Sequence, residues 1–401
     1  MERVERRSLS ARALLILCIL INMLSAFSSD IYLPAMPEVC TDFGITAAKA
    51  TMTITAFMIF YALGTLFGGP LCDKYGRKSV LLWGCVLFLG GSFCCMLAPT
   101  INGLISARIL AGIGAGVLTS DSFAIVHDCF PGEQGEKNIA LVQSIASIGP
   151  VIAPVIGAAI LKIASWRIVF MTITVLAISI LVLSLRFKES LSLDKRLTGG
   201  LLATLGRLLV VAGNKSIFLP LIIFALSSFS FLGYVGVSSY IYVLEFGLSE
   251  QQYSIFYAAA ALMAIIGPMV YMKFWLKAAK GQLAKSCFVV IFLCGALIMT
   301  AGVQSPFVFC ALVAVFTFFT AILRPLSMNI LFAQQSSDTG SVSALYNCVN
   351  FILGSAGMTV TTMGWGNLIA SFGAVLCLVA GLELLMWLLM LKSRVPCYSV
   401  K

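Results

Sequence analysis

The hydrophobic pattern divides the chain into long apolar runs separated by short polar turns. A helix that crosses the hydrocarbon of a membrane needs roughly 20 mostly apolar residues, and twelve runs meet that requirement. They cover residues 12–34, 50–71, 79–98, 102–126, 138–161, 167–186, 217–243, 253–275, 284–303, 306–331, 341–364 and 367–391. The pattern predicts an all-α membrane protein with twelve transmembrane helices and leaves little chain for a soluble domain.

Residues 187–216 form the longest stretch without a spanning run, and they divide the runs into two sets of six. We therefore expect two pseudo-symmetric six-helix bundles, an N-terminal one over 1–186 and a C-terminal one over 217–401, joined by a connector. Within the connector, residues 197–211 are apolar but too short and too rich in glycine to span a membrane. They are expected to form a helix that lies in the membrane interface.

Composition and charge agree with a membrane protein and indicate its orientation. Only 10% of the residues are charged, whereas soluble domains carry about 25% charged residues. With the N-terminus inside, 21 of the 26 lysines and arginines fall in segments that face the cytoplasm. This bias follows the positive-inside rule, so we expect both termini and the connector in the cytoplasm. It also explains the net charge of +10 without a nucleic-acid partner.

The sequence contains no pattern typical of an enzyme, a cofactor site or a metal site. No group of His, Cys, Asp and Glu has the spacing of metal ligands. No nucleophile motif or phosphate-binding loop lies in a fitting context. We therefore expect a protein that is not an enzyme and that binds neither a cofactor nor a metal.

Five ionisable residues lie inside the apolar runs: Asp30, Arg108, Asp121, Arg324 and Glu383. Each costs about 2.5–3.5 kcal/mol at the centre of a spanning helix, so most are expected to face the bundle interior or a wet cavity. With a rise of about 1.5 Å per residue, Asp30 and Arg108 fall in the same outer layer, where a pair across the cavity is feasible. A carboxyl group in such a cavity can bind and release a proton. The sequence therefore predicts proton coupling at Asp30 and Arg108.

Asp121 and Arg324 both fall near the inner ends of their runs. Two interpretations stay open for them. They form an inner gate pair between the two halves, or they are separate charges whose side chains reach the interface.

The fifth run contains a cluster of helix-bending residues: Gly149, Pro150, Pro154 and Gly157. The prolines remove two backbone donors and bend the helix, and the glycines permit close approach to a neighbouring helix. Other polar and aromatic residues are candidates for contact with a substrate, with ordinary packing as the alternative. These cavity candidates are Asn22, Tyr61, Phe123, Tyr234, Tyr346, Asn347, Asn350 and Phe351.

Several stretches together resemble the major facilitator superfamily. The turn Gly69-x-Leu71-x-Asp73-Lys74-x-Gly76-Arg77-Lys78 is similar to the inner-loop signature of that family. Arg108 with Gly112 and Gly116 resembles its helix-4 motif. The segment from Gly149 to Gly157 is similar to the helix-5 motif associated with antiporters, although Ile145 stands where the first glycine of that motif is expected.

Two further segments resemble one branch of the superfamily. Residues Asp30–Pro37 together with Trp166–Phe170 are similar to the Bcr/CflA drug-resistance branch, which consists of proton-coupled exporters with twelve spans. The resemblance implies that Asp30 is the protonation site, that Arg108 is its electrostatic partner, and that two six-helix halves rock about a midplane site.

The resemblance also implies a conformational latch at the inner surface. Its members are Gly69, Asp73, Gly76, Arg77, Lys78 and Asp128. Arg77 is expected to bridge to Asp128, and Asp73 to cap or pair near the start of a neighbouring helix.

We thus predict a multi-pass, monomeric protein of a bacterial inner membrane that works as a proton-coupled efflux transporter. Its partners are the lipid bilayer, protons and a small-molecule substrate that is amphipathic or drug-like. The alternative is a transporter of one dedicated metabolite, such as an amino acid or an osmolyte.

Overall fold

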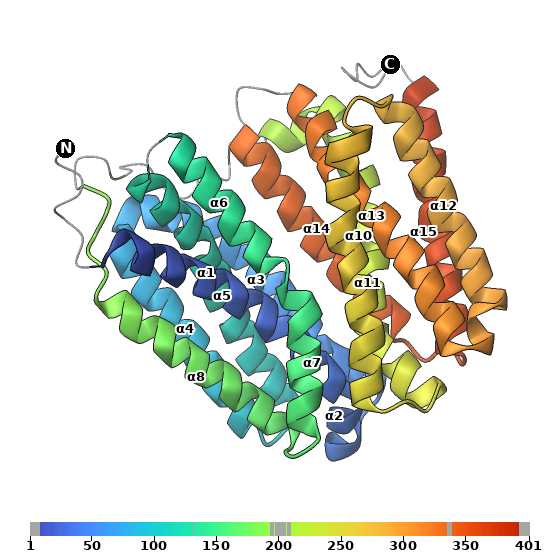
Figure 1. Ribbon diagram of the computed structural model, residues 1–401, viewed down its shortest axis with the longest axis horizontal. Helices are drawn as coiled ribbons and strands as arrows, with labels where there is room; N and C mark the ends of the chain where they lie inside the picture. The colour runs from blue at the N-terminus through green and yellow to red at the C-terminus, as the bar shows by residue number, and fades with distance from the viewer. Residues whose placement is uncertain are drawn as a thin grey trace. The chain divides into compact units, whose positions relative to one another are not determined.

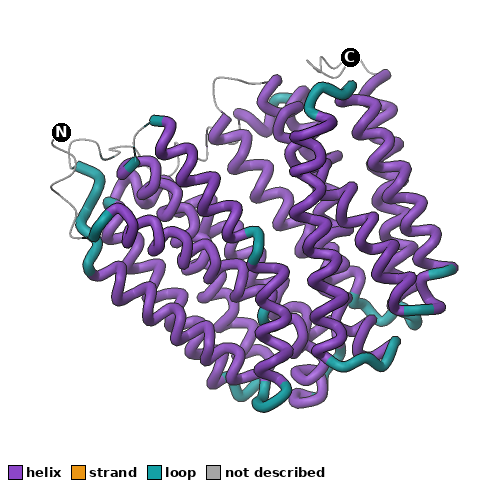
Figure 2. The backbone as a smooth tube through the Cα atoms, viewed as in Figure 1, coloured by secondary structure: helices purple, strands orange, loops and turns teal. Residues whose placement is uncertain are grey.

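The computed structural model describes residues 9–130, 132–192, 196, 206, 210–334 and 339–392. These residues are almost entirely helical and contain no β-strand (Figures 1 and 2). Among them, eleven segments are long and apolar enough to cross a membrane. The prediction of an all-α membrane protein is confirmed.

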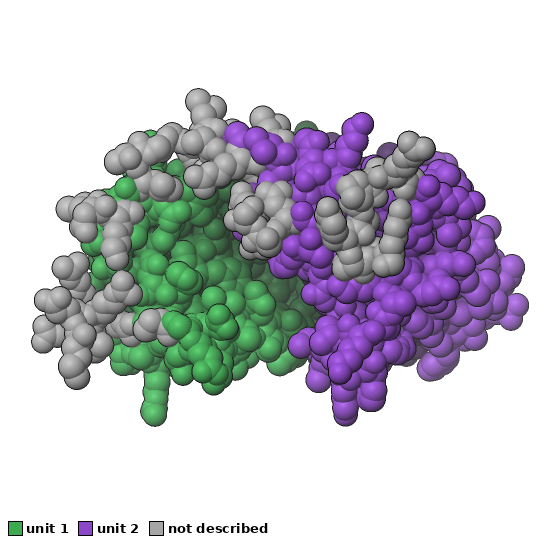
Figure 3. Space-filling view, turned by 90° about the horizontal axis from the view of Figure 1, so that it is seen from above, with its two compact units in different colours: residues 1–35, 52–205 green, residues 36–51, 206–401 purple. Residues whose placement is uncertain are grey.

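The chain forms two compact units, which Figure 3 colours separately. Unit 1 comprises residues 1–35 and 52–205, and unit 2 comprises residues 36–51 and 206–401. The sequence-based division at 187–216 does not anticipate that residues 36–51 pack with the second unit. Their place is explained by Tyr240, whose hydroxyl donates to the carbonyl oxygen of Ala47 at 3.3 Å.

Unit 1 is built around one long central helix, α5 (Ile101–Cys129). Its helices are α1 (Ala11–Asp30), α3 (Ala47–Tyr75, whose first residues belong to unit 2), α4 (Arg77–Leu97), α5 (Ile101–Cys129), α6 (Glu133–Ala146), α7 (Gly149–Leu161) and α8 (Trp166–Leu185). Helix α5 contacts α1, α4 and α6, and glycines let it approach its neighbours closely. A side chain at Gly112 would meet the backbone of Phe57 on α3, and one at Gly114 would meet the backbone of Phe88 on α4. Small residues of this kind allow helices to pack tightly in a membrane.

Unit 2 contains the remaining helices. They are α2 (Met36–Phe43), α10 (Lys215–Tyr240), α11 (Glu250–Val270), α12 (Lys280–Thr300), α13 (Pro306–Gln334), α14 (Thr339–Thr361) and α15 (Leu368–Lys392). Helices α10 and α11 each continue into a short π-helical turn, over Ile241–Glu245 and Tyr271–Trp275. The most extensive contacts join α10 to α14 and α12 to α15.

The structure refines two of the predicted runs, and a third predicted segment lies mostly outside the described residues. The run 138–161 is two helices, α6 and α7, because the chain bends at 147–148 just before Pro150. Helix α14 matches the run 341–364 but is not among the eleven segments apolar enough to span a membrane. The predicted interface helix over 197–211 lies outside the described residues, except for 206, 210 and 211.

Candidate functional site

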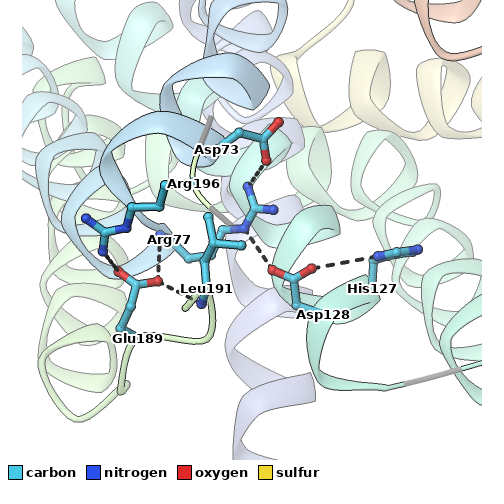
Figure 4. A network of polar contacts seen from close by, with 7 residues as sticks. All are labelled: Asp73, Arg77, His127, Asp128, Glu189, Leu191 and Arg196. Carbon is cyan, nitrogen blue, oxygen red and sulfur yellow. Dashed lines mark hydrogen bonds and ion pairs between the residues drawn. The ribbon is translucent and has the colours of Figure 1, made fainter. Parts of the chain in front are cut away.

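A network of charged residues surrounds the turn between α3 and α4 (Figure 4). Gly76 forms the turn with a positive φ of 92°, a conformation that glycine adopts without the strain a Cβ brings. The next residue, Arg77, begins α4 and points its guanidinium at two acids. Nη1 donates to Asp73 at 2.7 Å, and Nε donates to Asp128 at 2.9 Å.

Burial makes this pairing necessary. The Arg77 side chain is only 8% exposed, and those of Asp128 and Asp73 are 20% and 41% exposed. A charge withdrawn from water to this degree needs an opposite charge or hydrogen bonds to offset its lost solvation. The structure thus brings Arg77 and Asp128 together, and it pairs Asp73 with Arg77 across one helical turn.

Glu189 completes the network, and the sequence reasoning missed it. Its Oε1 accepts hydrogen bonds from the backbone N–H groups of Arg77 at 2.8 Å and Leu191 at 3.1 Å. Its Oε2 accepts from Arg196 at 3.4 Å. Glu189, rather than Asp73, therefore caps the first turn of α4, a position where a negative charge is favoured. The available signal in the sequence was an acidic residue in the connector, which contains Glu189 and Asp194 beside five lysines and arginines.

The remaining latch residues make fewer contacts. Lys78 donates to the carbonyl oxygen of Leu185 at 3.3 Å. A side chain at Gly69 on α3 would meet the Ser120 hydroxyl of α5 at 3.5 Å. His127 is 83% exposed, and its Nδ1 lies 3.7 Å from Asp128.

A second group of polar residues surrounds Arg108, in the middle of unit 1. Its Nη1 donates to the carbonyl oxygen of Ser28 at 2.9 Å and to the Ser28 hydroxyl at 3.2 Å, and its Nε donates to the carbonyl oxygen of Thr53 at 3.4 Å. The guanidinium carbon also lies 4.2 Å from the ring centre of Phe57 and 5.6 Å from that of Tyr32. Aromatic faces attract a cation in this way. They help to hold an arginine that is 1% exposed.

Asp30 is the last residue of α1 and is 7% exposed. It accepts a hydrogen bond from the Ser29 hydroxyl at 3.2 Å. Within the described part of the chain, it forms no ion pair with Arg108, whose Nη2 has no partner. Ser28, which binds Arg108, is two residues before Asp30 on α1.

A seam of polar side chains joins α1 to α5 between Arg108 and the C-terminal end of α5. The Asn22 side-chain amide donates to the Ser122 hydroxyl at 2.8 Å. The hydroxyls of Ser25 and Thr119 are 2.9 Å apart. Asn22 is therefore engaged between two helices of unit 1.

The glycines of the bent segment lie against α1. A side chain at Gly149 would meet the Cβ of Ala26 at 2.7 Å, and one at Gly157 would meet the backbone of Ile31. Pro150 lies in the first turn of α7, where its missing N–H would be unsatisfied in any helix, and Pro154 lies inside α7. The close approach at Gly157 therefore falls beside Asp30.

The inner gate candidates lie in different units. Asp121 on α5 is completely buried in unit 1, and neither carboxylate oxygen has a hydrogen-bond partner of normal geometry. The Cys72 thiol on α3 interacts with this carboxyl group. Arg324 on α13 of unit 2 has an exposed side chain. Their pairing stays a prediction.

The cavity candidates divide into packed and hydrogen-bonded residues. Tyr234 is 2% exposed and belongs to an aromatic cluster in which its ring centre is 6.0 Å from that of Tyr257. Tyr346 accepts from the Ser327 hydroxyl at 2.7 Å, and Asn350 is bonded to Ser228 and to the Tyr346 backbone. The other four candidates are half-buried: Tyr61, Phe123, Asn347 and Phe351.

Unit 2 also contains a buried acid that the prediction of sites left out. Glu383 on α15 is 1% exposed and accepts from the Ser227 hydroxyl of α10 at 2.6 Å. Across the described residues, no group of three or more His, Cys, Asp or Glu is arranged to hold a metal ion.

Comparison with known proteins identifies the class of the chain. Residues 18–358 match the model of the Major Facilitator Superfamily. The chain is 28% identical over 351 residues to YdgK, an uncharacterised MFS-type transporter of Bacillus subtilis, covering 86% of this chain and 87% of the relative. Multidrug resistance protein MdtL of Shigella dysenteriae is 33% identical over 156 residues, which cover 39% of this chain and 40% of MdtL.

A solved structure has the same fold. The D-xylose–proton symporter matches 97% of this chain and 99% of its own chain with a TM-score of 0.72 and 17% sequence identity. At this level of identity the likeness concerns the fold alone. The predicted transporter fold of two helical bundles is confirmed.

Proposed function

Because the chain belongs to the major facilitator superfamily, we propose that it is a proton-coupled antiporter that exports small amphipathic or drug-like compounds across a bacterial inner membrane. In this proposal the two units expose a midplane site to each side of the membrane in turn. Both termini lie in the cytoplasm, as the distribution of cations favours. The partial likeness to MdtL supports drug efflux over transport of a single metabolite.

The observation that carries the proposal is the environment of Asp30. This carboxyl group is 7% exposed, accepts one hydrogen bond, from Ser29, and has no cation paired with it in the described residues. Its charge state therefore depends on how much water and how close a cation the transport cycle brings to it. Arg108 is anchored at Ser28, so a shift of α1 along α5 changes the distance between the two charges.

The transport of substrate and of protons is then coupled, because the two ligands compete for the protein. Binding of a substrate in the state that favours the ionised carboxylate releases a proton, and binding of a proton favours release of the substrate. By linkage, each ligand changes the affinity for the other by the same factor.

The test is substrate-induced proton release from the purified protein, followed with a pH-sensitive dye in weak buffer. Tetraphenylphosphonium, a neutral drug and an amino-acid mixture serve as separate probes. We expect release with the first or second probe, loss of that release in Asp30→Asn, and retention in Asp42→Asn, which changes an exposed acid on α2. Release with amino acids only would favour the dedicated-metabolite alternative. Release that is undiminished in Asp30→Asn would overturn the coupling scheme.

A further inference from the structure

Helix α13 of unit 2 carries a positively charged residue inside its membrane-spanning segment. With a rise of about 1.5 Å per residue, Arg324 lies about 27 Å from Pro306, where α13 begins, and about 15 Å from Gln334, where it ends. A charge at such a depth is costly when it faces lipid, so it normally faces a partner or water. Arg324 therefore needs an opposite charge, hydrogen-bond acceptors or water beside it.

The side chain of Arg324 leaves α13 on the face that holds polar residues. Side chains three, four and seven positions apart share one face of a helix, and Thr317, Thr320 and Ser327 stand at these spacings from Arg324. Val315 lies on the opposite face and is 42% exposed, as suits a residue in contact with lipid. The exposed side chain of Arg324 thus points away from the apolar exposed face of its own helix.

Nothing in the described part of the chain neutralises Arg324. No described residue forms an ion pair or a hydrogen bond with its guanidinium. The hydrogen bond that involves this residue runs from the Ser327 hydroxyl to its backbone carbonyl oxygen at 2.7 Å. Tyr346 of α14 lies within electrostatic range of Arg324, but a neutral phenol does not offset a full positive charge. Asp121, the partner that the sequence suggested, is completely buried in unit 1.

The polar face of α13 also holds hydroxyl groups without partners. The buried hydroxyls of Thr317 and Thr320 form no hydrogen bond with any residue that the structure describes. Thr320 is about one helical turn from Arg324. A donor or acceptor withdrawn from water without a partner is costly. The face therefore combines an uncompensated cation with unused hydrogen-bonding capacity.

We propose that Arg324 binds the anionic group of the transported compound, so that the preferred substrates are amphipathic compounds with a carboxylate or another oxyanion. A guanidinium presents a planar fork of N–H donors that matches the two oxygens of a carboxylate. Such an anion supplies the opposite charge that the described residues lack. The inference rests on the transport function proposed above and adds a substrate class to it. Neutral amphipathic compounds still bind, but more weakly.

The test compares two probes that differ by one charge. N-dansyl-phenylalanine carries a carboxylate, and N-dansyl-phenylalanine amide carries a neutral carboxamide in its place. Binding to the purified full-length protein in a neutral detergent is followed by the rise in dansyl fluorescence. We expect the carboxylate to bind about tenfold more tightly than the amide, a ratio that one hydrogen bond to a charged group can supply.

Matched variants assign the preference to one residue. Arg324→Gln is expected to bring the ratio of the two affinities close to one by weakening only the carboxylate. Arg324→Lys should retain part of the preference, because lysine keeps the charge but not the fork of donors. Lys277→Gln removes a different exposed cation of unit 2 and should leave the ratio unchanged. If Arg324→Gln does not fold, Arg324→Lys decides.

The headgroup of an anionic lipid offers the same oxyanion chemistry, so a second arm of the experiment separates the two sources. The titrations are repeated with phosphatidylglycerol added to the detergent micelles. We expect the preference for the carboxylate probe to persist. Loss of that preference with phosphatidylglycerol, but not with phosphatidylcholine, would assign the anion at Arg324 to a lipid and overturn the proposal.

Three further results would overturn the proposal. The first is equal binding of the two probes, or no binding of the carboxylate probe. The second is a preference that survives unchanged in Arg324→Gln and Arg324→Lys. The third is a preference lost equally in Lys277→Gln, which would reflect the net charge of the protein. None of these measurements involves a proton, so failure of the coupling scheme at Asp30 would be seen separately from failure of this substrate class.

Discussion

Arg108 donates a hydrogen bond to the backbone carbonyl oxygen of Ser28 at 2.9 Å, which ties the N-terminal third of α5 to the last turn of α1. The bond does not use the whole guanidinium, because Nη2 is buried without a partner. A buried donor left unsatisfied costs about 1–3 kcal/mol. A conformation that offers Nη2 an acceptor is stabilised by a similar amount, and the carboxylate of Asp30 is the acidic group two residues beyond Ser28.

Arg108→Lys is expected to reduce substrate-induced proton release at least about tenfold while the protein still folds. Lysine keeps the charge, but its single ammonium cannot reproduce the forked donors that reach Ser28 and Thr53. Tenfold corresponds to about 1.4 kcal/mol, which is within the value of one hydrogen bond to a charged group. Release is measured with the pH-sensitive dye, and folding by gel filtration.

Arg167→Lys is the matched control for this change. Arg167 lies over the Trp166 ring at 4.2 Å, at the start of α8. We expect the Arg167→Lys variant to retain substrate-induced proton release. Full release from Arg108→Lys would mean that the positive charge alone is sufficient.

Gly157→Ala is expected to lower both stability and proton release. The new Cβ would collide with the backbone of Ile31, so α7 must move away from α1 beside Asp30. Overpacking of this kind costs about 1–3 kcal/mol. The control is Gly90→Ala on α4, where a Cβ meets nothing within 4 Å. Thermal unfolding in detergent should show a lower midpoint for Gly157→Ala only, and equal midpoints would contradict the close approach.

Asp128→Asn is expected to destabilise the protein more than Asp73→Asn. Both acids accept from Arg77, but the side chain of Asp128 is 20% exposed and that of Asp73 is 41% exposed. We expect a loss of about 1.5–3 kcal/mol for Asp128 and under about 1 kcal/mol for Asp73, because solvent screens the more exposed pair. Denaturant unfolding of the purified variants measures both values. The reverse order would show that Asp73 is the main partner.

Gly76→Ala is expected to cost more stability than Gly132→Ala. Both glycines combine a positive φ, 92° and 63°, with an extended ψ, 152° and −145°, so both substitutions carry a backbone cost of about 1–3 kcal/mol. Only at Gly76 does the added Cβ collide with neighbours, namely the side chains of Glu189 and Arg196. The difference between the two unfolding free energies therefore isolates the contact between the turn and the connector. A difference near zero would mean that Glu189 and Arg196 move aside freely.

Local patterns were sufficient for the class of the protein. The length and hydropathy of the runs predicted the membrane helices, because crossing hydrocarbon imposes the same requirement on every span. The turn from Gly69 to Lys78 indicated the family, because its residue types and spacing are contiguous in the chain. For Arg77 and Asp128, the expected bridge came from the resemblance to the family, and the structure brings the two residues within 2.9 Å.

Only the tertiary structure decided which distant groups meet. The partner of Arg108 is Ser28 and not Asp30, because the rotation of α1 about its axis sets which of neighbouring residues faces α5. Glu189 caps α4 across 112 residues of sequence, and residues 36–51 pack with unit 2. Hydropathy fixes how deep a helix lies in a membrane, but it says little about its rotation or neighbours. Depth was therefore determined by the sequence, and pairing by the packing of helices.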